Sequence, residues 1–245
     1  MPYDDYRDAI IDCGITIVET AGGNPQPHLP SFEAAGVKVI HKAVSVRHAL
    51  KAEQVGVDAV SIDGFECAGH PGDDDVPGLV LIAAAAKHCR FPSSPAAVSP
   101  PDQAGRRLGV GGIRGQHGTR FMATTEAPIH ANVKQRIVDN SERDTVLVFR
   151  EFRNTARVAR NSISEEIAEI SRRPGATFDD VAHLASGVRG RERVYGNGDV
   201  EGGLWWAGQA QGLIDNIADC QDVVDTIIAE ARRIITDTLP DQLTR

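Results

Sequence analysis

Residues 59–72 join a short apolar stretch to a glycine-rich loop, in which the one functional side chain is that of His70. In α/β enzymes the loops that follow parallel strands hold the reactive groups. The small residues Ala68 and Gly69 would let a flat ligand lie close to the backbone beside the imidazole. These residues predict a site at which His70 exchanges a proton with a bound molecule. A surface turn with a solvated histidine would have the same composition.

A second candidate is Lys42, which ends an otherwise apolar stretch at residues 37–42. Burying an ammonium group is costly without an anionic partner. Lys42 is therefore expected either to face a negative group or to extend its ammonium into solvent. Asp63 and Glu66 lie near His70 in the sequence, but their spacing assigns neither of them a role.

The elements that must position these residues alternate between strand and helix, about twenty residues apart. Strands are expected at residues 15–19, 37–42 and 59–62. Helices are expected at residues 31–35, 46–55 and 79–88. Ser45 is a suitable N-cap for the second of these helices. This alternation predicts an α/β fold with a parallel sheet and right-handed crossovers.

The pattern changes in the carboxy-terminal half. Residues 118–122 are expected to be another strand end, and residues 189–203 a polar, glycine-rich loop. Helices are predicted at residues 152–172, 178–185 and 222–239, the last with apolar residues at helical spacing. Trp205 and Trp206 are expected to lie in the core of this mostly helical lobe.

Composition excludes several classes of partner. The chain has 245 residues and a net charge of −8, which argues against nucleic acid or an anionic membrane as the main partner. No apolar run reaches membrane-spanning length and the first residues have no signal-peptide character, so a cytoplasmic protein is expected. The cysteines are scattered and are expected to be reduced thiols, with no metal site: Cys13, Cys67, Cys89 and Cys220.

Residues 93–117 do not fit the pattern, because they are rich in Pro, Ser, Gly and Arg where a strand, helix and strand are due. With GC-rich codons, a shift of one base lets residues 93–100 read Val-Val-Ala-Ser-Gly-Gly-Phe-Ala, a strand followed by a glycine turn. Residues 110–117 can be recoded in the same way to end in Gly-Asn-Met. The hypothesis is that two compensating frame errors scrambled this segment, which sequencing of the DNA would test.

The chain resembles the flavin-dependent nitronate monooxygenase (2-nitropropane dioxygenase) family, and most of all its bacterial NADH:quinone reductases. Matching stretches cover nearly the whole chain except residues 93–117. They are Val-Glu-Thr-Ala-Gly at 18–22, Lys-Val-Ile-His-Lys at 38–42, Gly-Phe-Glu-Cys-Ala-Gly-His-Pro-Gly at 64–72, Gly-Thr-Arg-Phe-Met at 118–122, Arg-Asn-Thr-Ala-Arg-Val-Ala at 153–159, Trp-Trp-Ala-Gly at 205–208 and Gln-Gly-Leu-Ile at 211–214.

The resemblance implies a TIM-type (β/α)8 barrel with an inserted helical substrate domain. Residues 1–124 and 223–245 would then be the carboxy-terminal part of an FMN-binding barrel, and residues 125–222 the substrate domain. The family's first strands would precede residue 1, so an incomplete, amino-terminally truncated barrel is expected. Its exposed edges would favour self-association.

The resemblance also implies roles for individual residues. His70 matches the family's catalytic histidine, and Tyr195 a tyrosine that faces the flavin entrance. For Tyr195, the alternative is a tyrosine on a surface loop with no role at the site. For Gly118 and Thr119, the alternative is a plain turn at the end of a strand. Lys42 would stabilise the negative charge of the reduced flavin ring. The implied FMN contacts are Lys42, Ala68, Gly69, Gly118 and Thr119.

The function that the resemblance implies is FMN-dependent reduction of a quinone by NADH or NADPH. The second hypothesis is a nitronate monooxygenase that oxidises alkyl nitronates with O2, and a weaker third is a flavin-containing enoyl reductase. All three act on a small-molecule substrate. A hypothesis of another class is that the chain is an inactive fragment of such an enzyme.

Overall fold

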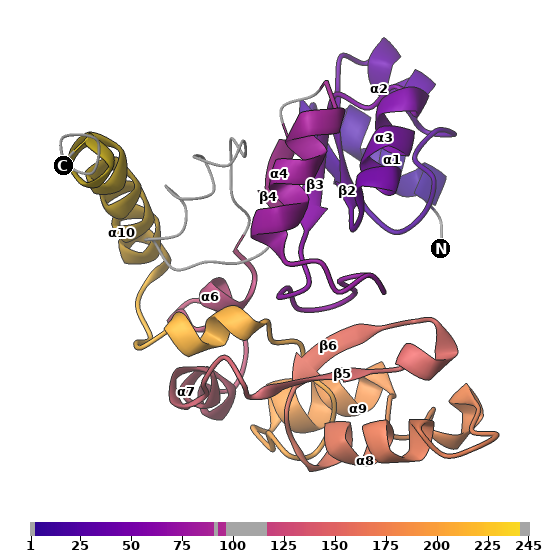
Figure 1. Cartoon of the computed structure of the whole chain (residues 1–245), viewed down its shortest axis with the longest axis vertical. Coiled ribbons are helices and arrows are strands. Elements are labelled where there is room, and N and C mark those ends of the chain that lie inside the picture. The colour runs from indigo at the N-terminus through magenta and orange to yellow at the C-terminus, as the bar shows by residue number, and fades with distance from the viewer. Residues whose placement is uncertain (1–2, 91–92, 97–116, 241–245) are drawn as a thin grey trace. The chain divides into compact units, whose positions relative to one another are not determined.

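The computed structural model describes residues 3–90, 93–96 and 117–240 (Figure 1). Tertiary contacts divide the chain into two compact units. The first contains the described residues up to 64 and those from 76 to 96, and the second contains residues 65–75 and 117–240. The loop that carries His70 therefore belongs to the second unit, although it directly follows a strand of the first.

The first unit is built on a parallel sheet with the strand order β1-β2-β3-β4. Its strands are β1 (Ile17–Thr20), β2 (Lys38–Ala43), β3 (Ala59–Asp63) and β4 (Ser93–Ala96). All neighbouring pairs are parallel. The three predicted strands and their parallel pairing are thus confirmed, with ends that move by one or two residues.

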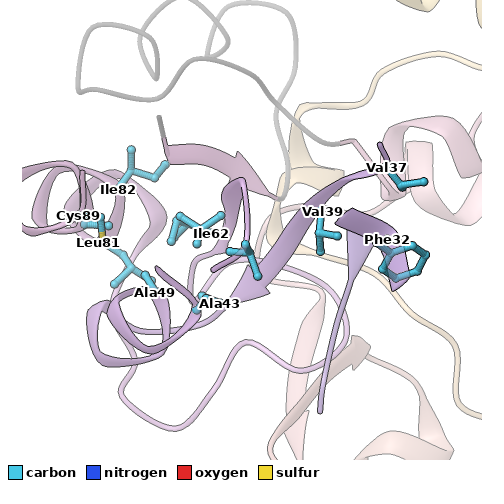
Figure 2. Close-up of a cluster of buried hydrophobic side chains, with 13 residues drawn as sticks. Phe32, Val37, Val39, Ala43, Ala49, Ile62, Leu81, Ile82 and Cys89 are labelled. Atoms are coloured by element: carbon cyan, nitrogen blue, oxygen red, sulfur yellow. The ribbon is translucent and has the colours of Figure 1, made fainter. Parts of the chain in front are cut away.

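The helices of the first unit are α1 (Tyr3–Asp12), α2 (Leu29–Ala34), α3 (Val46–Val55) and α4 (Gly78–His88). The Ser45 hydroxyl accepts a hydrogen bond from the backbone N–H of His48 at 3.2 Å, so the predicted N-cap of α3 is confirmed. These helices pack against one face of the sheet in a continuous hydrophobic core. Figure 2 shows Val39, Ala43 and Ile62 from the strands in this core, together with Leu81 from α4.

The alternate residues of the same strands belong to the opposite face of the sheet, since successive strand residues point to opposite sides. Glu19 of β1, Lys42 of β2 and Asp63 of β3 belong to this second face. In the register of the sheet, Lys42 lies opposite Ser61. Glu19, Lys42 and Asp63 therefore gather toward the carboxyl ends of three neighbouring strands.

Strand β4 occupies the place where the sequence pattern requires a strand, although residues 93–96 read Ser-Ser-Pro-Ala. It pairs with β3 so that Ser93 lies opposite Val60. Proline lacks a backbone donor and is tolerated on edge strands, and β4 is the last strand in the order of the described sheet. Residues 97–116 lie outside the described part of the chain, and the frame hypothesis stays a prediction.

The second unit contains an antiparallel pair, β5 (Thr145–Val148) and β6 (Ala156–Ala159), packed against helix α8 (Ser162–Ser171). The predicted helix over residues 152–172 is therefore wrong in its first half, where β6 lies. The boundary is set by Asn161, whose side chain accepts from the Ser164 N–H at 2.8 Å while the Ser164 hydroxyl accepts from the Asn161 N–H. This reciprocal cap starts a new helix after the strand.

Short helical segments fill most of the remaining second unit: α6 (Thr119–Met122), α7 (Ala131–Asp139), η1 (Arg150–Phe152), η2 (Phe178–Asp180), α9 (Gly187–Arg189), η3 (Gly190–Gly196) and η4 (Gln209–Leu213). The predicted helix at 178–185 is reduced to the turn η2, and the predicted loop at 189–203 begins with the helical η3. A Cβ on Gly190 would lie 2.5 Å from the carbonyl oxygen of Leu204, so the chain packs there only with glycine.

The carboxy-terminal helix α10 (Cys220–Arg233) continues into the wider turn η5 (Ile234–Thr238). The helix predicted at residues 222–239 is confirmed, but it starts two residues earlier. Asp219 caps it by accepting a hydrogen bond from the Asp222 N–H at 2.8 Å. Within the described residues, no helix is long and apolar enough to cross a membrane.

Glu126 is a second anchor for the start of α10. Its carboxylate accepts hydrogen bonds from the Cys220 N–H at 2.8 and 3.1 Å and from the Thr125 hydroxyl at 2.8 Å. These bonds, that of the Cys220 N–H above all, lower the pKa of Glu126 from 4.5 to about 2. A carboxyl group whose pKa is lowered by folding stabilises the folded state at pH values above its unfolded-state pKa. This stabilisation is lost as the pH falls through the folded-state pKa.

Glu126→Gln is therefore expected to lower the thermal unfolding midpoint at pH 7, and the difference from wild type should shrink between pH 4.5 and about 2. Unfolding followed by circular dichroism across this range is the measurement. Glu169→Gln, which changes an exposed ion pair with Arg173, is the matched control and should change the midpoint little. A loss at Glu126 that is independent of pH would contradict the assignment.

Candidate functional site

His70 is exposed in the loop of residues 65–75. Its imidazole lies next to the indole of Trp206, with ring centroids 5.8 Å apart and planes inclined by 48°. The Trp206 side chain is itself 42 % exposed. The two rings together offer an aromatic surface and a titratable nitrogen at the surface of the second unit.

The backbone next to His70 is open on one side. Gly69 has a φ of +83°, which side-chain-bearing residues rarely adopt, and no described atom lies within 4 Å of the place that its Cβ would occupy. Ala68 precedes it and is partly buried. The small residues therefore leave the free space that the sequence predicted.

The loop is hydrogen-bonded to strand β6 and to the first residue of η4. Gly69 and Arg157 exchange backbone hydrogen bonds, at 3.1 Å for the Gly69 N–H and 2.6 Å for the Arg157 N–H. The Gln209 N–H donates to the carbonyl of Glu66 at 2.9 Å. Such contacts fix the backbone beside His70 and so fix the position from which its side chain extends.

Tyr195 lies near the same aromatic pair. Its hydroxyl oxygen accepts a hydrogen bond from the backbone N–H of Trp206 at 3.3 Å. Burial raises the pKa of Tyr195, while the bond from Trp206 acts in the opposite direction. A neutral phenol is thus held against the segment that carries Trp206.

Gly118 and Thr119 lie at the start of the short helix α6, so the strand end predicted at 118–122 is wrong. Thr119 is buried, and its hydroxyl accepts the N–H of Gly208 at 3.1 Å. Gly118 has no described atom within 4 Å of a Cβ position. The structure therefore connects Thr119 to the chain just after Trp206 and leaves the Gly118 backbone open.

Lys42 belongs to the first unit, where its ammonium is paired with carboxylates. Nζ lies 3.1 Å from Oε1 of Glu19 and 3.8 Å from Oδ2 of Asp63, and the lysine side chain is 30 % exposed. The expectation of an anionic partner is confirmed. With one cation and two carboxylates, this group of three residues has a formal charge of −1.

Among the predicted residues, the structure brings His70 and Tyr195 together at Trp206, with Ala68 and Gly69 next to His70 in its loop, while Lys42 lies in the other unit. Trp206 was predicted to be a core residue, and that is wrong, whereas Trp205 is 1 % exposed and is core. In a non-helical segment neighbouring side chains tend to point to opposite sides, which is the signal that could have separated the two tryptophans. Arg157, Glu19 and Asp63 were also missed.

The fold and the site together indicate the class of protein. Helices cover one face of a parallel sheet, charged residues lie at the carboxyl ends of its strands, and a histidine loop follows one of them. This arrangement is typical of α/β enzymes. A family model described as nitronate monooxygenase matches residues 2–230, and the chain belongs to this family.

Known proteins agree with this assignment. The nitronate monooxygenase of Paraburkholderia phytofirmans is 28% identical over 194 residues, which are 76% of this chain and 52% of the relative. The structure of FabK from Thermotoga maritima superposes with a TM-score of 0.88 at 28% identity, covering 98% of this chain and 76% of that one.

Nitroalkane oxidase from Streptomyces ansochromogenes shares the fold, with a TM-score of 0.80 at 24% identity and coverage of 96% of this chain and 69% of that one. The chain spans about half the length of the Paraburkholderia relative. The activity of the full-length relatives is therefore only proposed for this chain.

Proposed function

We propose that the chain acts in a flavin-dependent oxidoreductase, in which FMN passes electrons from NADH or NADPH to a quinone. The observation that carries the proposal is the exposed imidazole of His70 beside the open side of Gly69 and the ring of Trp206. A flat ligand has room there next to a group that can give or take a proton. Membership of the nitronate monooxygenase family supports a flavin as that ligand.

When bound, FMN would supply the two-electron transfer, and the protein supplies orientation and protons. A quinone that gains two electrons also takes up two protons. His70 is proposed to deliver one of them to a quinone oxygen from a ring nitrogen and to regain it from solvent. The other is the proton that the hydride of NADH or NADPH brings with its two electrons, so one proton from solvent balances the reaction. Trp206 limits the positions of the imidazole, and Tyr195 holds the backbone of Trp206 in place.

Gly118 and Thr119 are proposed to contact the FMN phosphate. The open side of the Gly118 backbone supports this role, because a phosphate oxygen could approach it without a clash. The Thr119 hydroxyl accepts from Gly208 and keeps its own hydrogen to donate. Both groups act as neutral donors and bring no charge to the phosphate.

Lys42 is proposed to contact the flavin ring, but Glu19 and Asp63 offset its charge. Glu19→Gln would change the formal charge of the three residues from −1 to 0 and is expected to tighten FMN binding by about 3- to 10-fold at low salt. Fluorescence titration of FMN measures this in the chain with residues 93–117 recoded and joined to the amino-terminal segment of a family member. Glu33→Gln, an exposed residue of α2, should leave the affinity unchanged, and weaker binding in Glu19→Gln would exclude a flavin contact by Lys42.

The described sheet is proposed to be part of a (β/α)8 barrel, with the substrate domain at residues 125–222. One observation favours the alternative of an inactive fragment. Strand β1 is the first in the order of the described sheet, so its outer edge pairs with no strand among the described residues. An open sheet edge favours self-association. Size-exclusion chromatography at several concentrations separates a monomer from such an assembly.

The second enzymatic candidate is oxidation of alkyl nitronates with O2, which is supported by the name of the Paraburkholderia relative. Anaerobic mixing of the FMN-loaded protein with NADH, NADPH or a nitronate separates the candidates. Rapid loss of the flavin absorbance with NADH or NADPH supports the reductase. Loss with the nitronate alone would contradict the reductase and support the monooxygenase.

A further inference from the structure

Arg157 is a buried arginine beneath the His70 loop. It lies on strand β6, and only 3 % of the residue is exposed. Nε donates to the carbonyl of Phe65 at 3.0 Å, and Nη1 donates to the hydroxyl of Thr145 at 2.8 Å. The guanidinium also lies over the Phe65 ring, with Cζ 4.4 Å from the centroid. One side chain thus contacts both the backbone and the ring of the loop's first residue.

The backbone of Arg157 contacts the loop a second time, through the two hydrogen bonds with Gly69. The residue next to His70 and the first residue of the loop are therefore both held by Arg157. Other contacts hold the far end of the loop: the Thr155 hydroxyl donates to Asp73, and the Arg150 guanidinium pairs with Asp75. These do not reach residues 65–70.

The charge of Arg157 is unusual for so buried a position. No described carboxylate forms an ion pair with it, and Nη2 has no hydrogen-bond partner among the described residues. Burial lowers the pKa of Arg157, and the negative charges of Glu66 and Asp75 oppose that effect. Burying a guanidinium with an unused donor costs stability, so a packing role alone would be served better by an apolar residue.

We propose that Arg157 is a positioning residue, which holds residues 65–70 on β6 and so fixes the imidazole of His70 against Trp206. The inference rests on the proposed function, because that function makes the His70 imidazole the group that reacts. Cation–π contact and charge-assisted hydrogen bonding act together at Phe65, and the planar, multi-donor guanidinium makes both at once. Lysine cannot replace such a fork.

Amide hydrogen exchange of the chain itself, measured residue by residue with NMR, tests the inference. Arg157→Met keeps the volume and the backbone of β6 but removes the guanidinium. The Gly69 amide is expected to exchange roughly tenfold faster or more, while the paired amides of β5 and β6 keep their protection. Arg160→Met, which removes a neighbouring arginine that contacts Glu165 and Thr145 and not the loop, should leave Gly69 unchanged.

The position of His70 is read from the indole N–H signal of Trp206. His70→Ala is expected to shift this signal in the wild-type background and not in the Arg157→Met background, where the imidazole is no longer held. An equal shift in both backgrounds, or unchanged exchange at Gly69 in a folded Arg157→Met, would overturn the inference.

If Arg157→Met loses protection throughout β5 and β6, Phe65→Leu decides instead. It removes the ring under the guanidinium and is expected to speed exchange at Gly69 by a smaller factor. Unchanged exchange would overturn the inference. None of these measurements uses flavin, NADH or quinone, so a protein that gives the expected exchange but no flavin chemistry would contradict the proposed function alone.

Discussion

His70→Ala is expected to lower quinone turnover by about 10²–10⁴-fold, the range typical of a lost general acid or base. The imidazole is exposed and touches Trp206, so its removal leaves no buried gap. Flavin content should stay nearly unchanged, because a loop imidazole adds little to a cofactor held by backbone donors and Lys42. The assay uses the chain with residues 93–117 recoded and joined to the amino-terminal segment of a family member.

The control is His183→Ala, which removes an exposed histidine of the same unit. It should change turnover less than about twofold, since surface substitutions away from a site have small effects. A His70→Ala protein that loses its flavin, or that turns over as fast as wild type, would exclude His70 as the group that supplies the proton.

FMN binding is the second large effect. The chain as it stands is expected to bind FMN weakly or not at all, because residues 93–117 lack the Ser-Gly-Gly turn of the recoded sequence, which the resemblance to the family implies would bind the phosphate. Each lost charge-assisted hydrogen bond costs about 1.5–3 kcal/mol, or roughly 10- to 150-fold in affinity. The recoded and extended protein is expected to be yellow and to lose its colour with NADH or NADPH.

Absorbance and fluorescence titrations with FMN measure both proteins. The matched control carries the extension with residues 93–117 unchanged, which separates the effect of the turn from that of the added segment. Tight, stoichiometric FMN in the unchanged 245-residue chain would contradict the frame hypothesis. A recoded protein that folds but ignores FMN would contradict the proposed cofactor.

Local chemistry made part of the fold predictable. The strands of the first unit follow from short apolar runs, and the start of α3 follows from Ser45, because a cap depends on residues next to it in the sequence. The strand β6 was predicted as helix, because Ala-Arg-Val-Ala is too short to show a period of its own. Its antiparallel partner β5 is equally short, and the pairing of the two segments is what identifies both as strands.

The candidate site divides in the same way. His70 and Gly69 were predictable from the composition of one loop. The roles of Trp206 and Arg157 depend on contacts with that loop from positions far along the chain. Neither residue type predicts such a contact, since tryptophan more often lies in the core and arginine more often lies on the surface.

Stopped-flow measurement of the two half-reactions tests most directly whether His70 supplies a proton in a flavin-dependent oxidoreductase. Hydride transfer from NADH or NADPH to the flavin needs no proton from the imidazole, so His70→Ala should leave the rate of flavin reduction nearly unchanged. The reaction of the reduced enzyme with quinone should slow by about 10²–10⁴-fold if proton transfer limits it. An equal loss in both half-reactions would show that His70 only shapes the pocket and would contradict its proposed role.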